Sequence, residues 1–232
     1  MVEVEKVSKQ YGTKTVLNIQ SLTVEKGEIV GIVGNNGAGK TTLFKLLLDL
    51  IESTTGAIFL EGIPVAESDV WKQTTGAFID EKFLIDYLWP QEYFQLVLEL
   101  LQTKPNDLNQ ALMPFEAFFN GEIMGHKKLI RDFSKGNQKK IGIAAALLGR
   151  PKLIFLDEPF THLDPSSQLR LKELIQSQNQ SWGTTFLISG HELNNITDTC
   201  TRIIFLEDGM IKDDFVNTYE THERLQDHFK IS

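Results

Sequence analysis

Two short and almost wholly apolar runs, at residues 28–33 and 153–156, stand out along the chain. Runs of this length and composition predict strands covered on both faces, as the strands of a parallel sheet are. Further short strands are expected at residues 2–7, 16–24, 57–60, 185–189 and 203–206. Asp208-Gly209, soon after the last of these, is typical of a hairpin turn.

The longer stretches between these runs predict helices. Residues 42–51 are dense in leucine and other good helix formers, so a buried helix is expected there. Pro90 suits the first position of a helix, and apolar side chains recur at helical spacing after it up to residue 101. An amphipathic stretch at residues 108–119 is interrupted by Pro114. Further helices are expected at residues 134–149, 166–176, 191–199 and 219–229.

The alternation of strands and helices predicts an α/β fold with a mainly parallel sheet. Between about residue 83 and residue 133 the pattern is helical only, which indicates a helical insert. The 232-residue chain has the composition of an ordinary globular protein, with 41% hydrophobic and 23% charged residues. Disordered and collagen-like structures are therefore excluded.

Charge and cysteine content argue against several classes of function. A formal net charge of −8 argues against a basic surface for DNA or RNA over the whole domain. The single cysteine, Cys200, excludes an intrachain disulfide and a cysteine-based zinc site. The charged N-terminus is unlike a secretory signal. The longest uncharged apolar run, residues 141–149, is shorter than the roughly 18 residues of a membrane span, so we expect a soluble protein whose membrane role needs a partner.

The strongest chemical signal lies between the strand at residues 28–33 and the helix at residues 42–51. The sequence Gly34-Asn-Asn-Gly-Ala-Gly-Lys40-Thr41 matches the phosphate-binding loop pattern G-x-x-x-x-G-K-[ST]. In such a loop, main-chain amides and the positive end of the following helix surround a phosphate. Lys40 is then expected to reach the β- and γ-phosphates, and the Thr41 hydroxyl to bind Mg²⁺. The residues expected to bind nucleotide here are Gly34, Asn35, Asn36, Gly37, Ala38, Gly39, Lys40, Thr41 and Thr42.

Two adjacent carboxylates, Asp157 and Glu158, follow the apolar strand at residues 153–156. Ligands of parallel sheets bind beyond the carboxyl ends of the strands, so Asp157 is expected near the metal held by Thr41. Glu158 is a candidate general base that polarises an attacking water. Taken alone, the two acids could equally form a solvated surface turn.

With these two motifs and four further matches, the chain resembles a nucleotide-binding subunit of the ATP-binding cassette (ABC) family, from residue 11 to about residue 212. Residues 133–138, Phe-Ser-Lys-Gly-Asn-Gln, are similar to the LSGGQ signature, and residues 161–164, Thr-His-Leu-Asp, to the D-loop. The resemblance implies a P-loop NTPase core with an N-terminal antiparallel β subdomain at residues 1–80 and 134–215. It also implies a helical subdomain at about residues 81–133 and a short helical tail at residues 216–232.

The resemblance also implies roles for single residues. Tyr11 would stack on adenine, and His191 would contact the γ-phosphate and hold the water and Glu158 in register. The residues implied to act on the ATP of a partner subunit, or across the dimer, are Ser134, Gly136, Asn137 and Asp164. Local alternatives stay open: Ser134 and Asp164 could cap helices, the latter before Pro165, and a lone tyrosine or histidine is often structural or exposed.

Three residues depart from the family pattern. The signature carries Lys135 where glycine is usual and Asn137 where glutamine is usual. Asp80 stands where the Q-loop glutamine is expected; its carboxylate can bind Mg²⁺, directly or through water, but cannot donate a hydrogen bond while ionised. An acidic residue here resembles the bacitracin and lantibiotic type of exporter ATPase.

The function expected from these observations is that of an ATPase subunit that powers a membrane exporter. Two copies, or two homologous subunits, would enclose ATP and Mg²⁺ head to tail at the inner face of the cell membrane. A separate permease would dock on the helical insert. The alternative is a soluble ABC ATPase in assembly or regulation. The basic cluster at residues 127–140 is interpreted as a solvated helix face near nucleotide rather than a nucleic-acid site.

Overall fold

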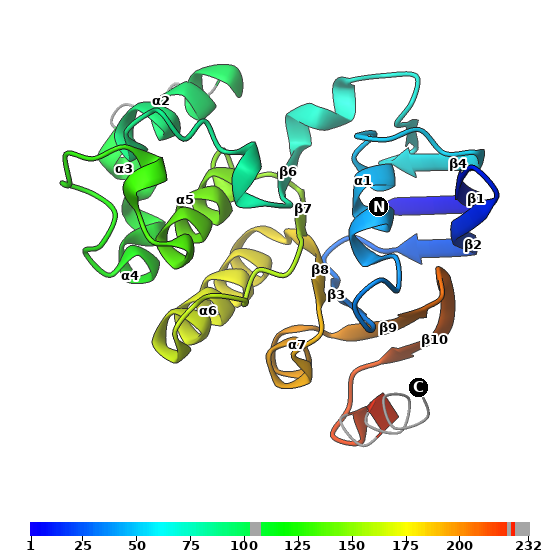
Figure 1. Cartoon of the computed structure of the whole chain (residues 1–232). Helices are drawn as coiled ribbons and strands as arrows, with labels where there is room; N and C mark the ends of the chain where they lie inside the picture. The colour runs from blue at the N-terminus through cyan, green and yellow to red at the C-terminus, as the bar shows by residue number, and fades with distance from the viewer. Residues whose placement is uncertain (103–107, 222–223, 226–232) are drawn as a thin grey trace.

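The larger of two sheets forms the centre of the molecule (Figure 1). The computed structural model describes residues 1–102, 108–221 and 224–225. The order of the strands is β10-β9-β3-β8-β7-β6. The five strands from β9 to β6 pair in parallel, and β10 pairs antiparallel to β9 through the hairpin at Asp208-Gly209. Their bounds are β3 Ile29–Val33, β6 Thr75–Phe78, β7 Leu153–Leu156, β8 Thr185–Gly190, β9 Arg202–Glu207 and β10 Met210–Val216.

A second, antiparallel sheet is built from the N-terminal part of the chain. Its strand order is β2-β1-β4-β5, and long stretches of β1 and β2 pair with each other. One face of these strands is apolar and buried, because alternate residues of a strand point to opposite faces. The bounds are β1 Val2–Tyr11, β2 Lys14–Val24, β4 Thr55–Leu60 and β5 Ile63–Pro64.

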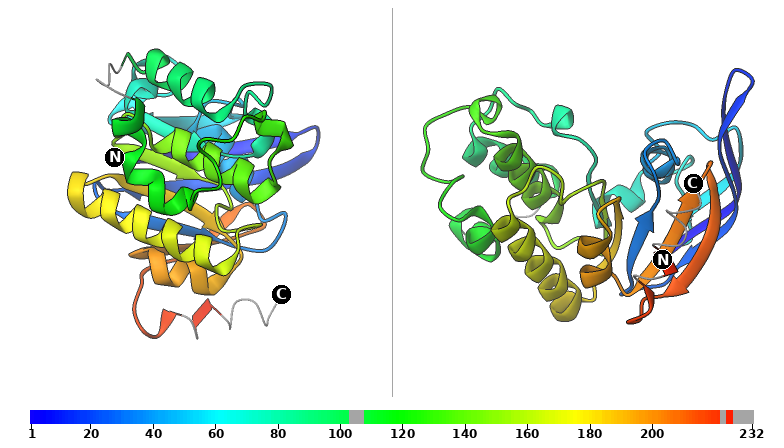
Figure 2. Two further views of the ribbon diagram at one scale, coloured as in Figure 1. Left: turned by 90° about the vertical axis from the view of Figure 1, so that its left-hand side faces the viewer. Right: turned by 60° about the horizontal axis from the view of Figure 1, so that its bottom comes forward.

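Helices cover both faces of the central sheet. Helix α1 lies between the two sheets, and α5, α6 and α7 lie on the opposite face of the central sheet (Figure 1), as the right-hand view of Figure 2 also shows. The helix bounds are α1 Lys40–Leu47, α2 Pro90–Leu100, α3 Leu108–Leu112, α4 Glu116–Phe119, α5 Lys135–Leu147, α6 Pro165–Trp182 and α7 Leu193–Thr199. The described residues also include the 3₁₀ turns η1 Val70–Thr74, η2 Glu81–Phe83, η3 Met113–Phe115 and η4 Ile130–Asp132.

The central strands supply two separate cores, because their residues are buried on both faces. In β7, Leu153 and Phe155 pack with α1 and the N-terminal sheet, whereas Ile154 and Leu156 pack with α5 and α6. Phe155 meets Phe44 of α1 edge to face, with ring centroids 5.7 Å apart. This burial on both faces explains why the apolar runs have no alternation of polar residues.

The fold class expected from the sequence is confirmed: a mainly parallel sheet, an N-terminal antiparallel sheet and a helical region after β6. Strand β6 was not among the expected strands, and α6 extends to Trp182, beyond the predicted end at residue 176. The helix predicted at residues 219–229 falls largely outside the described residues. Division into core and helical subdomains remains a prediction.

No helix in the described part of the chain is long and apolar enough to cross a membrane.

Candidate nucleotide-binding and hydrolysis site

The loop between β3 and α1 is shaped by a close approach to a neighbouring strand. A Cβ atom at Gly34 would lie 2.1 Å from the backbone oxygen of Leu206 in β9, so only glycine fits at the end of β3. The loop then turns into α1, which begins at Lys40. Main-chain N–H groups of the first helical turn have no partner within a helix, which makes such a helix start suited to an anion.

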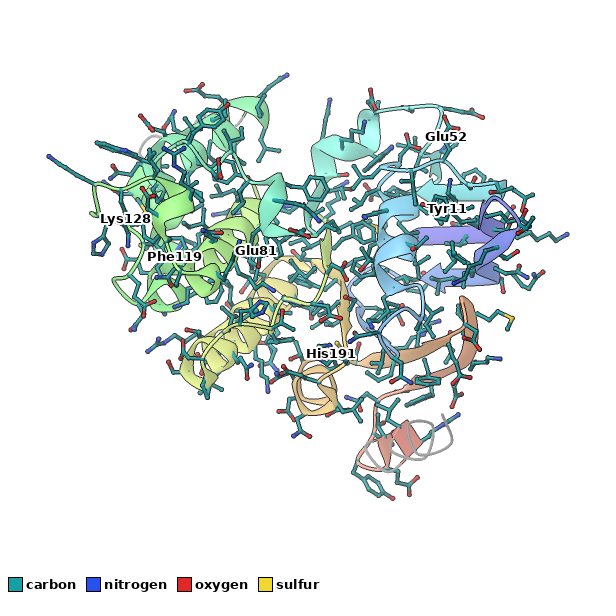
Figure 3. The ribbon with its side chains drawn as sticks, in the orientation of Figure 1. Tyr11, Glu52, Glu81, Phe119, Lys128 and His191 are labelled. Atoms are coloured by element: carbon teal, nitrogen blue, oxygen red, sulfur yellow. The ribbon has the colours of Figure 1, made fainter. Side chains whose placement is uncertain are left out.

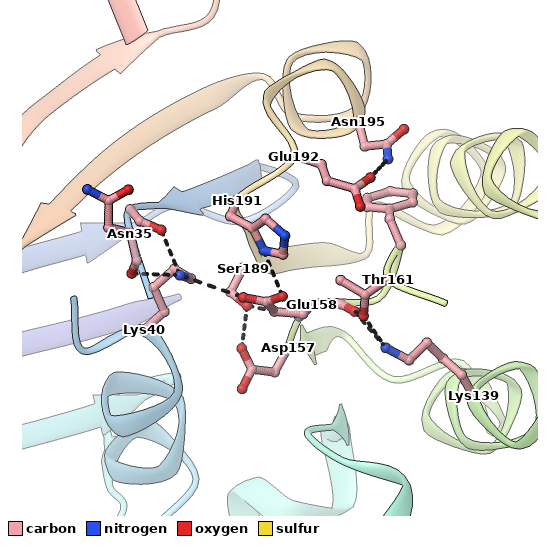
Figure 4. A network of polar contacts seen from close by, with 12 residues as sticks. Asn35, Lys40, Lys139, Asp157, Glu158, Thr161, Ser189, His191, Glu192 and Asn195 are labelled. Atoms are coloured by element: carbon pink, nitrogen blue, oxygen red, sulfur yellow. Dashed lines mark hydrogen bonds and ion pairs between the residues drawn. The ribbon is translucent and has the colours of Figure 1, made fainter. Parts of the chain in front are cut away.

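The side chain of Lys40 is buried and points back into this loop (Figure 4). Its Nζ donates hydrogen bonds to the backbone oxygens of Gly34, at 2.7 Å, and Asn35, at 3.2 Å. Nζ also lies 3.6 Å from a carboxylate oxygen of Glu158. The ammonium group is therefore held between the loop and the end of β7.

Adjacent ends of parallel strands bring the two carboxylates of residues 157–158 to the same edge as this loop. Ser189, in β8 beside β7, donates a hydrogen bond to the Asp157 carboxylate and accepts one from the backbone N–H of Glu158 at 2.9 Å. The carboxylate of Glu158 lies 2.9 Å from Nδ1 of His191, just after β8 (Figure 4). Lys40, Glu158 and His191, predicted separately from the sequence, thus meet in one network.

Burial raises the pKa of Asp157, and hydrogen bonds from the hydroxyls of Ser189 and Thr41 oppose that rise. The contact with Thr41 places a hydroxyl and a carboxylate side by side at the start of α1. Mg²⁺ is usually bound by one or two protein oxygens together with phosphates and water, so this pair of donors fits the ion. Among the residues that the structure describes, no group of three or more His, Cys, Asp or Glu side chains is suited to a metal by itself.

Asp80 lies two residues beyond the end of β6, the edge strand next to β7. A cleft of about 290 Å³ is lined by residues that include Asp80, Thr41 and Asp157, the three predicted metal ligands. The Asp80 carboxylate accepts a hydrogen bond from the backbone of Lys82 at 2.9 Å and pairs with the Lys82 side chain at 2.9 Å. Partial burial acts to raise the pKa of Asp80, but these bonds and the charges of Lys82 and Lys135 outweigh it and lower the pKa.

The backbone of Glu158 has a left-handed conformation, with φ of 47°, which is uncommon outside glycine. Its carbonyl oxygen accepts hydrogen bonds from the Thr161 hydroxyl at 2.9 Å and from Nζ of Lys139 at 2.8 Å. Sequence reasoning missed Lys139 as part of this site. It also assigned the basic cluster to a solvated face, which is wrong for Lys139 and Lys140: both are buried, and Lys140 pairs with Glu122 at 3.0 Å.

The predicted signature residues lie at the start of α5. Ser134 caps this helix by accepting a hydrogen bond from the backbone of Asn137, as its local alternative predicted. Gly136 packs so closely on the D-loop segment that a Cβ atom there would lie 2.7 Å from the backbone oxygen of His162. Asp164, at the end of that segment, caps α6 through the backbone N–H of Ser167.

Tyr11 lies at the end of β1 in the N-terminal sheet, where its side chain is 54% exposed (Figure 3). The ammonium of Lys9 lies 5.0 Å from the centre of its ring. An exposed ring flanked by a cation is free to stack on a further planar group.

Comparison with known proteins agrees with this geometry. The sequence model of the ABC transporter family matches residues 17–161. The chain belongs to the ABC transporter family.

Several ABC proteins of known name are similar over most of the chain. The lantibiotic transport ATP-binding protein SrtF of Streptococcus pyogenes is 32% identical over 99% of this chain and 96% of its own length. The bacitracin transport ATP-binding protein BcrA of Enterococcus faecalis is 33% identical over 97% of this chain and 71% of its own length. An uncharacterised ABC transporter ATP-binding protein of Nostoc is 36% identical, and the chain spans only 56% of that relative.

Solved ABC structures share the fold. An ATP-binding subunit of an ABC transporter has a TM-score of 0.85 at 27% identity, covering 98% of this chain and 93% of that one. A dimeric post-hydrolysis state of the ATP-binding cassette MJ0796, bound to ADP and Pi, has a TM-score of 0.83 at 25% identity, covering 94% and 99%. These findings identify the chain as an ATP-binding domain with the ABC ATPase fold and activity.

The residues matched by the ABC family model include only part of the predicted site. It includes the loop at residues 34–41, Asp80, the start of α5 and the two carboxylates at residues 157–158. Tyr11, Asp164 and His191 lie outside it. For these three residues the assignment depends on position and geometry alone.

Proposed function

We propose that this chain is the ATP-hydrolysing subunit of an exporter for peptide or antibiotic-like cargo, acting at the inner face of the cell membrane through a separate permease. Full-length similarity to the lantibiotic transport protein SrtF, and similarity over most of BcrA, support this choice of cargo class. Asp80, an acidic residue in place of the Q-loop glutamine, also resembles the bacitracin and lantibiotic type of exporter ATPase.

The observation that carries the proposal is the position of the Glu158 carboxylate. It lies 3.6 Å from the ammonium of Lys40 and 2.9 Å from the imidazole of His191, at the end of a buried strand. A carboxylate in this place acts as general base: it accepts a proton from water while the water oxygen attacks the γ-phosphorus and the bond to the bridging oxygen breaks. ADP and phosphate are the products.

The other residues bind and orient. Lys40 exchanges the backbone oxygens of Gly34 and Asn35 for the β- and γ-phosphate oxygens, and His191 holds Glu158 in place. Thr41 and Asp157 would hold Mg²⁺, and Asp80, which lines the same cleft, would bind it directly or through water. When bound, the ion neutralises developing negative charge on the phosphates.

The signature residues would act on a second copy or on a homologous subunit. Ser134, Gly136 and Asn137 lie at the N-terminus of α5, where a helix favours an anion. By analogy with the dimeric ABC cassette MJ0796, we infer a head-to-tail dimer in which each ATP contacts one phosphate loop and the partner's signature. Tyr11 would stack on the adenine, and Asp164 would make a contact across this dimer.

The test is Glu158→Gln, which removes the base but preserves the shape of the side chain. We expect ATP hydrolysis to fall by at least about 100-fold. ATP binding should persist, and the variant should form a dimer with ATP in size-exclusion chromatography. Glu116→Gln, at an exposed position of α4, is the matched control and should hydrolyse ATP at the normal rate. Normal hydrolysis by Glu158→Gln would show that the base is another group.

A further inference from the structure

Lys139 connects three separate segments of the chain. Its Nζ donates hydrogen bonds to the backbone oxygen of Glu158, at 2.8 Å, and to the Thr161 hydroxyl, at 2.7 Å (Figure 4). The same atom lies 3.6 Å from Oε1 of Glu81 in η2. The residue is only 4% exposed, although it is located in the second turn of a helix whose first residues face solvent.

The buried charge of the Glu81 carboxylate is compensated by the charge of Lys139. Oε1 of Glu81 is buried and accepts no hydrogen bond from any residue that the structure describes, so the ion pair with Lys139 compensates for burying this charge. Figure 3 shows Glu81 between the helical region and the central sheet. A buried charge whose partner is removed is strongly unfavourable, so movement of η2 and the position of Lys139 are coupled.

Charges of opposite sign line both sides of this contact. On one side, Asp80 and Glu81 follow β6; on the other, Lys135 and Lys139 are four residues apart and therefore on one face of α5. The charge of Lys135 contributes to the lowered pKa of Asp80. Burial lowers the pKa of Lys139, and the carboxylates of Glu81, Glu158 and Asp157 oppose the change.

We infer that Lys139 is a positioning residue for Glu158, and that the Glu81–Lys139 ion pair links the loop after β6 to the backbone that carries the general base. The inference rests on the proposed role of Glu158 as that base. Lys139 and Thr161 hold the carbonyl of a residue with φ of 47°, a conformation that persists only where surrounding groups fix it. Small displacements of a catalytic group are enough to slow a reaction severely.

The Glu81–Lys139 link connects η2, which is partly exposed at the surface, with the backbone of Glu158. Phe83, the last residue of η2, lines a groove of about 280 Å³ between β6, α2 and α5. A partner that moves η2 from this groove would therefore change the ion pair at Glu81 and, through Lys139, the hydrogen bonds on Glu158. The Glu81–Lys139 ion pair supplies this link in a chain that lacks the usual glutamine at residue 80.

The experiment compares Lys139→Met, Glu81→Gln and the double variant, all as the full chain, by steady-state ATP hydrolysis. Methionine preserves much of the length of lysine without its charge. We expect Lys139→Met to lower kcat about tenfold while KM for ATP stays within about twofold. Glu81→Gln should lower kcat about threefold, and the double variant should be no slower than Lys139→Met, because both changes break one link. Lys172→Met, which breaks the 2.7 Å ion pair between Lys172 of α6 and Asp198 of α7, is the matched control and should leave kcat unchanged.

A purely structural role predicts a different result: a lower melting temperature with kcat per folded molecule unchanged. That result, or fully additive effects in the double variant, would overturn the inference. If Lys139→Met does not fold, Glu81→Gln decides, and unchanged kcat in that variant overturns the inference. Glu158→Gln is measured in the same series. Loss of activity there together with normal Lys139→Met activity rejects the link and leaves the proposed function standing.

Discussion

At Gly136 the start of α5 packs closely against the D-loop segment. In Gly136→Ala the added Cβ would lie 2.7 Å from the backbone oxygen of His162, so one of the two segments has to shift. Overpacking of this kind costs about 1–3 kcal/mol. Alanine gains up to about 1 kcal/mol in helix propensity. We therefore expect a net loss of roughly 1 kcal/mol in the free energy of unfolding, measured by urea denaturation.

The control for this substitution is Gln95→Ala, at an exposed position inside α2. It should change the free energy of unfolding by no more than about 0.5 kcal/mol. If Gly136→Ala is as stable as the original protein, the close approach to His162 is not a constraint on the fold. Packing would then not explain why residue 136 is glycine.

At the scale of residues, the sequence predicted which side chains lie close together where a motif fixes both the residue type and its neighbours. Lys40, Glu158 and His191 were each predicted from their own segments, and parallel strand ends bring them together. Lys139 was missed because its neighbours in sequence are other lysines, a pattern typical of an exposed face. Only packing of α5 against η2 and the D-loop, which no local pattern encodes, buries it.

The N-terminus of α6 provides a prediction at the scale of an element. Asp164 accepts hydrogen bonds from the backbone N–H of Ser167 at 3.0 Å and from the Ser166 hydroxyl at 2.6 Å. These bonds hold the pKa of Asp164 well below its usual value. Replacement of a capping aspartate by alanine costs about 1 kcal/mol, so Asp164→Ala should lower the free energy of unfolding by that amount at pH 7.

The effect of this substitution should depend on pH in a defined direction. Because the pKa of Asp164 is lower in the folded state, its contribution is complete above the usual aspartate pKa of about 3.9 and is lost as the pH falls below it. The stability difference between the original protein and Asp164→Ala should therefore shrink from pH 7 to about pH 3. Asp69→Ala is the control, because the Asp69 side chain makes no capping hydrogen bond and its ion pair with Lys72 is exposed to solvent. A difference that stays constant with pH would mean that the carboxylate charge is not involved.

At the scale of elements, apolar runs and capping residues predicted the buried strands and the helix starts. The edge strand β6 and the end of α6 were not predicted. The buried strands β3 and β7 were predicted because both faces are covered, which leaves a continuous apolar run. Strand β6 has only four residues, two of them Thr75 and Gly76, and its place comes from pairing with β7 rather than from its own sequence. Helix α6 ends at Trp182, and Gly183 follows in a left-handed conformation. The last turns of this helix are mostly polar, so the apolar pattern did not predict them.

At the scale of the whole molecule, the groove between β6, α2 and α5 is the surface where we expect the permease to dock. It is lined by apolar residues from all three elements, and Phe83 at its edge is 58% exposed. Exposed aromatic side chains next to a groove are typical of protein contacts, because they bury a large apolar area at a small entropic cost. The groove also lies beside η2, from which the Glu81–Lys139 pair leads to Glu158.

Phe83→Asp tests this surface, because a charge placed at its edge has to be desolvated when a partner binds. We expect recovery of a stoichiometric membrane-spanning subunit with the tagged chain from detergent extracts to fall at least about tenfold. Leu169→Asp is the matched control: Leu169 is also 58% exposed, but it lies on α6 and does not line the groove, so recovery should be normal. Equal recovery with both variants would place the permease elsewhere on the chain. If the original chain recovers only soluble partners, the exporter role itself is wrong, and a role in assembly or regulation becomes the better account of the same ATPase site.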